Sequence, residues 1–211
     1  MPIGSAADVK TGDRVVIVGA GGVDALGSAT VSATREFAGN WEYLLDTAIF
    51  TTPPYPNWSG TALVNREGKL LGIGSLIVGD TTGKGDGIAG NMFVPIDGLR
   101  PILGDLLATG RISSSAKPWL GITADEMHGR LFVRRVTPGG PADKAGIKAR
   151  DQVVGVNGEP IATLAAFYRK VWARGDAGVA APIDVETDGA KRRVDVTSGN
   201  RLDYLKLGRT F

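Results

Sequence analysis

A serine set among small residues is the first candidate for chemistry in this sequence. Residues 57–76 read NWSGTALVNREGKLLGIGSL, so Ser59 lies just before two strand-like segments. A serine hydroxyl is a weak nucleophile unless a general base lies beside it. The sequence has one histidine, His128, between two predicted strands, where a lone histidine is usually just solvated. Two interpretations stay open: Ser59 is a nucleophile whose base is not in these 211 residues, or it is a turn serine without chemistry.

Composition excludes several classes of function. The 24 basic and 22 acidic residues leave a net charge of +2, which gives no reason to expect a nucleic-acid partner. The chain has no cysteine, so disulfides, thiolate catalysis and cysteine zinc sites are excluded, and no metal site is predicted. No apolar run approaches the ~18 residues of a membrane span. The N-terminus, MPIGSAADVKTGD, has no region typical of a secretory signal, and a signal in a longer precursor stays open.

The first half of the chain has the pattern of an antiparallel β domain. Short runs rich in valine, isoleucine, threonine and aromatics are separated by glycine, proline, asparagine and aspartate. The predicted strands are 14–18, 27–34, 41–45, 61–65, 70–78 and 90–95. This close spacing favours a barrel or sandwich. Leucine and isoleucine at helical spacing then predict a helix that Asp97 caps and Gly110 ends.

A small, polar stretch at 112–117 is typical of a linker. The sequence therefore predicts domains at 1–111 and 118–199, and a tail at 200–211. The second domain combines strands at 131–136 and 152–156, a one-turn helix at 141–146, a helix at 163–175 and a hairpin formed by 183–186 and 192–196. The fold class is mainly β, with a helix ending the first domain and an α+β second domain.

One glycine-rich segment resembles a cofactor site superficially. Residues 15–22, VVIVGAGG, look like the strand and turn of a dinucleotide site, but Asp24 replaces the third glycine and a strand-like segment follows. That site needs a helix N-terminus for the pyrophosphate. A loop between two strands is therefore favoured, and no cofactor is expected.

Taken together, the motifs resemble the trypsin-fold serine proteases of the HtrA type. Residues 59–65 and 68–73, SGTALVN and GKLLGI, resemble the nucleophile segment G-N-S-G-G-P-L-V-N and the G-x-V-I-G-I that follows it. Further matches, in the same order as in the family, are VKTGDRVV at 9–16, LDTAI at 45–49, FVP at 93–95, KPWLGI at 117–122, VTPGGPADKAGI at 136–147 and DQVVGVNG at 151–158. The resemblance implies the second β-barrel of the protease domain followed by a PDZ domain.

The resemblance also implies a catalytic arrangement. Ser59 takes the nucleophile position, and the amides of Asn57 and Ser59 take the oxyanion-hole positions. The catalytic His and Asp would lie on a first barrel that precedes residue 1. The nucleophile loop departs from the family pattern, with Asn57 for Gly, Trp58 for a small polar residue, Thr61 for Gly, and about five extra residues before it. The interpretation is an endopeptidase fragment that is inactive alone, and the alternative is a non-catalytic peptide-binding pseudoprotease.

The second domain resembles a module that binds peptides by strand addition and captures their C-terminal carboxylate on backbone amides. Trp119, Leu120, Gly121 and Ile122 match the carboxylate loop, and Thr123 continues into the pairing strand. Phe167 and Val171 either face the groove or pack in the core. The expected partners are peptides or protein C-termini with an apolar last residue. The chain's own end, residues 208–211, has that form, although a frayed terminus is commoner.

Two further expectations come from the resemblance. A barrel without its first-barrel partner exposes an apolar face, so we expect self-association or association with the missing barrel. The compartment is not evident from the chain, and the family resemblance implies a periplasmic or extracytoplasmic location.

Overall fold

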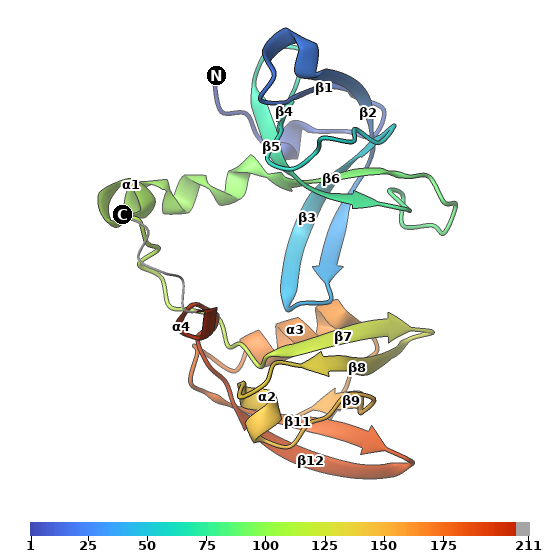
Figure 1. Cartoon of the computed structure of the whole chain (residues 1–211), viewed down its shortest axis with the longest axis vertical. Coiled ribbons are helices and arrows are strands. Elements are labelled where there is room, and N and C mark those ends of the chain that lie inside the picture. Colours follow the sequence, from blue (N-terminus) through green and yellow to red (C-terminus); the bar gives the residue numbers. More distant parts are fainter. Residues whose placement is uncertain (206–211) are drawn as a thin grey trace. The chain divides into compact units, whose positions relative to one another are not determined.

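The computed structural model describes residues 1–205, so the C-terminal residues 208–211 considered above lie outside the described range. By their contacts the residues form two compact units (Figure 1). The first comprises Met1–Phe37 and Leu45–Ser113, and the second comprises Ala38–Leu44 and the chain from Ser114 onward. Within the described part of the chain, no helix is long and apolar enough to cross a membrane.

The first unit is a closed antiparallel barrel. Its strands follow the order β1-β2-β3-β6-β5-β4. They are β1 (Arg14–Val18), β2 (Leu26–Gly39), β3 (Tyr43–Thr52), β4 (Ala62–Val64), β5 (Leu70–Val78) and β6 (Gly90–Pro95). Alternating side chains fill the interior, because successive residues of a strand point to opposite faces. Ile17, Val31, Ile49, Leu63 and Phe93 are all almost fully buried there.

Short helical segments accompany the barrel. These are η1 (Ala6–Asp8), η2 (Gly22–Ala25), η3 (Ile96–Gly98), η4 (Arg100–Ile102) and α1 (Leu103–Thr109). The prediction of one helix capped by Asp97 is wrong. The Asp97 carboxylate instead accepts hydrogen bonds from the Ser5 hydroxyl at 2.7 Å and the Ala6 N–H at 2.6 Å. Pro101, which has no N–H to donate, lies where two 3-10 turns precede α1. Gly110 ends α1 in the left-handed conformation, as predicted.

Two strands of the barrel are longer than predicted. β3 continues to Thr52 because the run Ile49–Thr51, which pairs with β6, is completely buried. β2 continues to Gly39, five residues beyond the predicted end at 34. The extension brings the chain to residues 40–42, which join β2 to β3 and belong by their contacts to the second unit.

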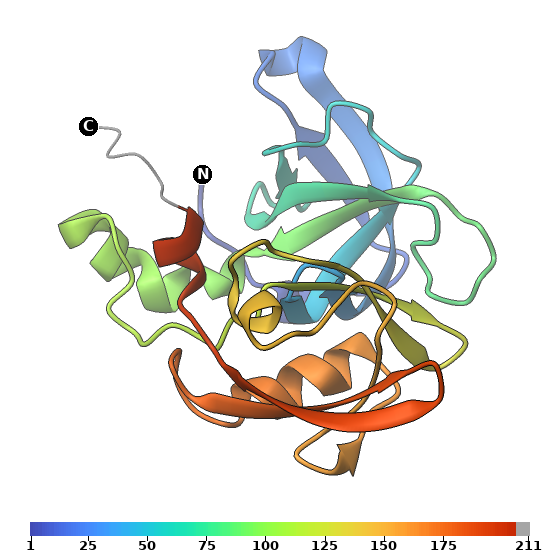
Figure 2. The same cartoon turned by 60° about the horizontal axis from the view of Figure 1, so that its bottom comes forward.

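The second unit is a sheet with helices. Its strands follow the order β12-β11-β9-β8-β7, and the short β10 pairs with β9. The strands are β7 (Ile122–Met127), β8 (Arg130–Val136), β9 (Gln152–Val156), β10 (Glu159–Pro160), β11 (Ala180–Thr187) and β12 (Ala190–Thr197). The helices are α2 (Pro141–Lys144), α3 (Leu164–Trp172) and α4 (Arg201–Leu205). Helix α3 contacts β7 and β9 (Figure 2).

Two predicted features of this unit, the helix at 163–175 and the final hairpin, are present as α3 and as β11 with β12. Thr163 caps α3 by accepting a hydrogen bond from the Ala166 N–H at 3.1 Å. Asp188 and Gly189 both have positive φ and turn β11 into β12, as a tight two-residue hairpin requires. The predicted mainly-β fold class is confirmed, with a six-stranded ring of antiparallel strands followed by a sheet with helices.

Candidate functional site

Ser59 lies at the surface in a tight turn. The Trp58 carbonyl accepts hydrogen bonds from the Thr61 N–H at 3.2 Å and from the Thr61 hydroxyl at 2.8 Å. Gly60 has a φ of 72°, which an L-residue with a side chain rarely adopts. Ser59 is therefore presented to solvent between a closing hydrogen bond and a left-handed glycine.

Strand β5 holds this turn at very close range. The Gly60 N–H donates to the Gly74 carbonyl at 2.9 Å. A Cβ atom on Gly74 would lie only 2.0 Å from the Trp58 carbonyl oxygen, so only glycine allows this approach. The role of Gly74 was missed from the sequence, because a glycine inside a strand gives no sign of which backbone approaches it.

Asn91 anchors the loop that leads to the serine. Its buried side chain accepts a hydrogen bond from the Tyr55 N–H at 2.7 Å and donates to the Tyr55 carbonyl at 3.2 Å. The Tyr55 phenol in turn donates to the Ala25 carbonyl at 3.1 Å. The proline-containing loop is thus tied to β6 and to the end of η2.

The residues that would complete hydrolytic chemistry are not assembled around Ser59 within the described part of the chain. No hydrogen bond among residues 1–205 involves the Ser59 hydroxyl. Asn57 is exposed, and its φ is not positive. His128 is exposed and forms, with Gly129, the two-residue turn between β7 and β8, with φ values of 51° and 69°. His128 therefore lies in an exposed turn, as its position between two predicted strands indicated.

The second cluster of candidate residues forms a loop of converging amides. The Leu120 carbonyl accepts from the Ala142 N–H at 2.9 Å, and the Gly121 carbonyl accepts from the Thr137 N–H at 2.8 Å. Gly121 has a φ of 79°. With the carbonyls engaged on one side and the chain reversed at Gly121, the N–H groups of Leu120, Gly121 and Ile122 point to a common position.

A carboxylate occupies that position. Glu42 accepts three hydrogen bonds, from Leu120 at 2.8 Å on Oε2, and from Gly121 at 2.7 Å and Ile122 at 2.8 Å on Oε1. Bonds from backbone N–H groups to an ionised carboxylate are among the stronger ones in proteins. The loop is therefore built to hold a carboxylate, and in this structure the group comes from the chain itself.

The edge of β7 and helix α3 border the loop. β7 is the edge strand of its sheet, and its Ala124 N–H donates to the Asn40 carbonyl at 3.1 Å. Glu126 at the far end of β7 accepts from the Leu164 N–H at 3.0 Å, which ties the strand to the start of α3. A strand edge and a helix thus flank the amide loop, as a groove for an extended segment requires.

Phe167 and Val171 lie on α3 and are buried. They belong to one core cluster with Leu120 and Ile122, and Ala38 and Leu44 pack against the same cluster. Trp119 is also buried, and its ring lies 4.9 Å from that of Tyr204. Thr123 follows Ile122 on β7 and pairs with Arg135 of β8. Apart from Ser59 and Asn57, the predicted site residues are brought together around the amide loop.

Opposing effects act on the pKa of the Glu42 carboxyl group. Burial raises the pKa of Glu42 to about 7, while the N–H groups of Leu120, Ile122 and Gly121 and the charge of Arg201 act to lower it. The Glu42 residue as a whole retains some exposed surface, because its backbone lies at a turn, whereas its carboxylate end is enclosed. Burial also raises the pKa of the Tyr168 phenol, which keeps that group neutral. No motif in the sequence marks Glu42, which lies between Trp41 and Tyr43 and about 80 positions before the loop.

Comparison with known proteins matches both halves of the chain. Residues 118–197 match the PDZ domain family. Serine protease Do-like HtrA of Bacillus subtilis is 27% identical over 76% of this chain and 40% of its own length. Serine protease PepD of Mycobacterium tuberculosis is 30% identical over 93% of this chain and 45% of its own length. The solved structure of the HtrA-type protease AlgW with a tripeptide covers 94% of this chain and 68% of that chain, with a TM-score of 0.57 and 23% identity.

The chain is a homologue of the HtrA/DegP-family serine proteases. It has a trypsin-like β domain followed by a PDZ domain at residues 118–197, and the predicted resemblance is confirmed. The chain spans less than half the length of the two curated relatives named above.

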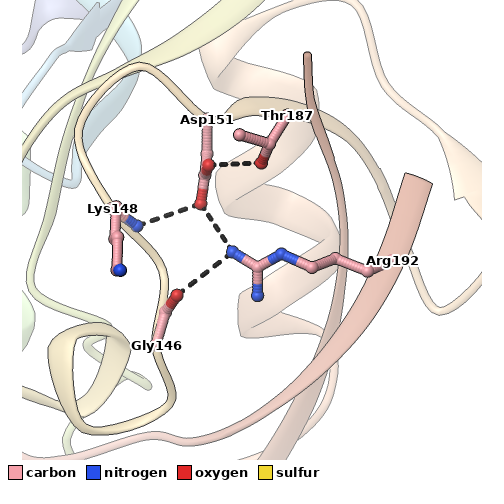
Figure 3. A network of polar contacts seen from close by, with 5 residues as sticks. All are labelled: Gly146, Lys148, Asp151, Thr187 and Arg192. Atoms are coloured by element: carbon pink, nitrogen blue, oxygen red, sulfur yellow. Dashed lines mark hydrogen bonds and ion pairs between the residues drawn. The ribbon is translucent and has the colours of Figure 1, made fainter. Parts of the chain in front are cut away.

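A buried aspartate organises the PDZ domain beside α2. Asp151 accepts hydrogen bonds from the Thr187 hydroxyl at 2.5 Å, the Lys148 N–H at 3.0 Å and Arg192 at 2.8 Å (Figure 3). Arg192 also donates to the Gly146 carbonyl at 3.1 Å. This network joins the segment after α2 to the hairpin of β11 and β12. It has a structural role and holds the segment that leads into β9.

Proposed function

We propose that the PDZ domain of this HtrA homologue binds peptides and protein C-termini through their terminal carboxylate. The observation that carries the proposal is the convergence of the Leu120, Gly121 and Ile122 amides on one carboxylate, with distances of 2.7–2.8 Å. Structures of the HtrA-type protease AlgW with a decapeptide and with a tripeptide support peptide binding.

In the proposed complex, the peptide extends the sheet along the outer edge of β7. Ile122 and Ala124 offer N–H groups on that edge, and Thr123 lies between them. The buried core cluster that contains Leu120, Phe167 and Val171 lies beside the loop, so we expect a preference for an apolar last side chain such as valine or phenylalanine. The Trp119 ring lies close to Gly121 of the loop. We expect micromolar affinity, since a short added strand is a small interface that must order its ligand.

The test is a titration of a labelled peptide that ends in valine, compared with its C-terminally amidated form. The proposal expects the free acid to bind at least tenfold more tightly, because amidation removes the charge that the amides hold. Gly121→Ala should weaken binding, since a Cβ there meets the Trp119 ring at 3.2 Å and the backbone needs a φ of 79°. Gly129→Ala is the matched control, with a similar φ of 69° in the turn after β7 and open space around it. Equal affinity for acid and amide would overturn the proposal.

For the barrel we propose that Ser59 has the nucleophile position and that the amides of Asn57 and Ser59 have the oxyanion-hole positions of a serine endopeptidase. The named curated relatives are serine proteases, and Ser59 is exposed in its turn, which supports this assignment. Hydrolysis then depends on a base supplied from outside these residues. The alternative proposal is a pseudoprotease that keeps only its peptide groove, and the altered loop around Trp58 and Thr61 favours it.

We also propose that the chain associates with itself or with a first barrel. Several large apolar side chains of the first unit are exposed, which supports an interaction surface. They include Val23, Leu26, Ile73, Ile77 and Ile88, with 37–83% of their surface exposed. Light scattering at tens of micromolar tests this, and a clean monomer would contradict it.

A further inference from the structure

A segment of the chain itself occupies the carboxylate loop. Residues 38–44 belong by their contacts to the same unit as the PDZ domain. Glu42, in the middle of this segment, supplies the carboxylate that all three loop amides bind. The segment therefore takes the position at which a peptide's C-terminal carboxylate is expected.

The backbone of the same segment takes a second position that a bound peptide uses. The Asn40 carbonyl accepts a hydrogen bond from the Ala124 N–H at 3.1 Å, on the outer edge of β7. Its side chain also donates to the Asp125 carboxylate at 3.2 Å. One main-chain bond on the edge strand and one carboxylate on the loop are the two elements of C-terminal recognition by strand addition.

Helices α3 and α4 hold the segment in place. The Tyr168 phenol donates to the Gly39 carbonyl at 2.7 Å and accepts from the Glu42 N–H at 3.2 Å. Arg201 donates to the Trp41 carbonyl at 3.2 Å. Glu42 has a φ of 59°, a left-handed conformation that is uncommon for a residue with a side chain and that places the carboxylate at the amides. Polar contacts thus reach residues 39–42 from α3, α4, β7 and the loop.

We propose that Glu42 is an internal ligand of the PDZ carboxylate loop, and that residues 39–42 must leave the groove before a peptide with a free C-terminal carboxylate binds. This inference rests on the proposed peptide-binding function and adds its regulation. The segment and the peptide need the same three N–H groups, so they exclude each other.

The expected size of the effect follows from competition within one chain. When the binding-competent state is only a fraction of the population, the apparent dissociation constant rises by the inverse of that fraction. A segment that occupies the loop for nine tenths of the time weakens peptide binding about tenfold. Because the segment is tethered, its effective concentration is high and does not fall on dilution. Removing its carboxylate should therefore raise peptide affinity by about tenfold or more.

The experiment uses the full chain with two variants of Glu42 and a matched control. Glu42→Ala removes the carboxylate, and Glu42→Gln keeps the size but turns an NH₂ group toward one of the donating amides. Glu67→Ala is the control, since Glu67 is an exposed residue in the turn between β4 and β5 and pairs with Lys69. Each protein is titrated with a labelled peptide ending in valine, as the free acid and as the amide.

The outcomes separate the inference from the proposed function. Tighter binding of the free acid to both Glu42 variants, with Glu67→Ala unchanged, supports the inference. Equal affinity of wild type and Glu42 variants for the acid, with the acid still preferred over the amide, overturns the inference and leaves the proposed function standing. The absence of any preference for the acid in all four proteins overturns both.

A second measurement does not depend on how the variants fold. Amide hydrogen exchange in the wild-type chain without peptide should show protection at Leu120, Gly121 and Ile122, because each N–H is bonded to Glu42. Fast exchange at all three amides would overturn the inference.

Discussion

Tyr168 and Glu42 are joined by a hydrogen bond of 3.2 Å from the Glu42 N–H to the Tyr168 phenol oxygen. The phenol also donates to the Gly39 carbonyl at 2.7 Å, and the ring is buried in the PDZ core. One side chain of α3 thus holds both ends of the segment that fills the carboxylate loop. Tyr168 therefore belongs to the PDZ core and also bonds residues 39 and 42 of the segment that occupies the loop.

Tyr168→Phe should release this segment in part. The variant keeps the ring but leaves the Gly39 carbonyl and the Glu42 N–H without their partner, which costs roughly 1–3 kcal/mol in the occupied state. We expect peptide affinity to rise several-fold, less than in Glu42→Ala. Tyr55→Phe, which removes a phenol bonded to Ala25 in the first unit, is the control and should not change peptide affinity. A Tyr168→Phe variant that binds peptide more weakly than wild type would contradict the prediction.

Peptide binding should depend on pH through Glu42. Its pKa is raised from an ordinary 4.5 to about 7 in the occupied loop, so between these values the occupied state holds a proton that the released segment has lost. Raising the pH through this window therefore favours release of the segment. The α-carboxyl of the free peptide is ionised throughout this window, since its ordinary pKa is about 3.5. The charge of Arg201 acts to lower the pKa of Glu42, and Tyr168, whose pKa is raised by burial, stays neutral.

We accordingly expect tighter peptide binding to wild type at pH 8 than at pH 5.5. Glu42→Gln, which cannot titrate, should show little change over the same range. Titrations at both pH values check this, and a wild-type affinity that falls as the pH rises would show the opposite sign.

Gly74→Ala should disrupt the turn that carries Ser59. The new Cβ would lie 2.0 Å from the Trp58 carbonyl oxygen and 2.5 Å from the Thr61 hydroxyl, so backbone must shift. We expect a loss of about 1–3 kcal/mol in the free energy of unfolding. Gly79→Ala, at the end of β5 with nothing within 4 Å, should stay within about 0.5 kcal/mol of wild type. Urea unfolding of both variants measures the difference, and equal stabilities would show that the turn relaxes freely.

Asp151→Asn should destabilise the PDZ domain. Asp151 is 2% exposed and holds Thr187, Lys148 and Arg192, and asparagine offers one acceptor oxygen and no charge for these donors. We expect a loss of about 2–4 kcal/mol. Glu159→Gln, which removes an exposed ion pair with Lys170, should cost at most about 1 kcal/mol. Thermal unfolding distinguishes the two, and similar losses for both would show that the Asp151 network adds little.

The chain alone should not react with a fluorophosphonate probe at Ser59. The only histidine of the sequence is His128, which forms the turn between β7 and β8, and no hydrogen bond among the described residues reaches the Ser59 hydroxyl. Mass spectrometry after incubation, with Ser59→Ala as the control, tests this. Rapid stoichiometric labelling that is lost in Ser59→Ala would show that a base acts on the serine.

Local patterns in the sequence determined the identity of most elements. The helical period of residues 163–175 predicted α3, and the strand-like runs 183–186 and 192–196 predicted the last hairpin, because such periods depend on nearby residues. The carboxylate loop at Gly121 was predicted from the resemblance of the motif KPWLGI to the family. The same local reasoning did not determine the end of β2, the break before α1 at Pro101, or whether Phe167 and Val171 are core residues, because packing partners decide these. Glu42 is the clearest case, because no motif around it indicates that its carboxylate binds the loop amides. Its carboxylate reaches amides 78–80 positions away, and only the tertiary structure brings these distant residues together.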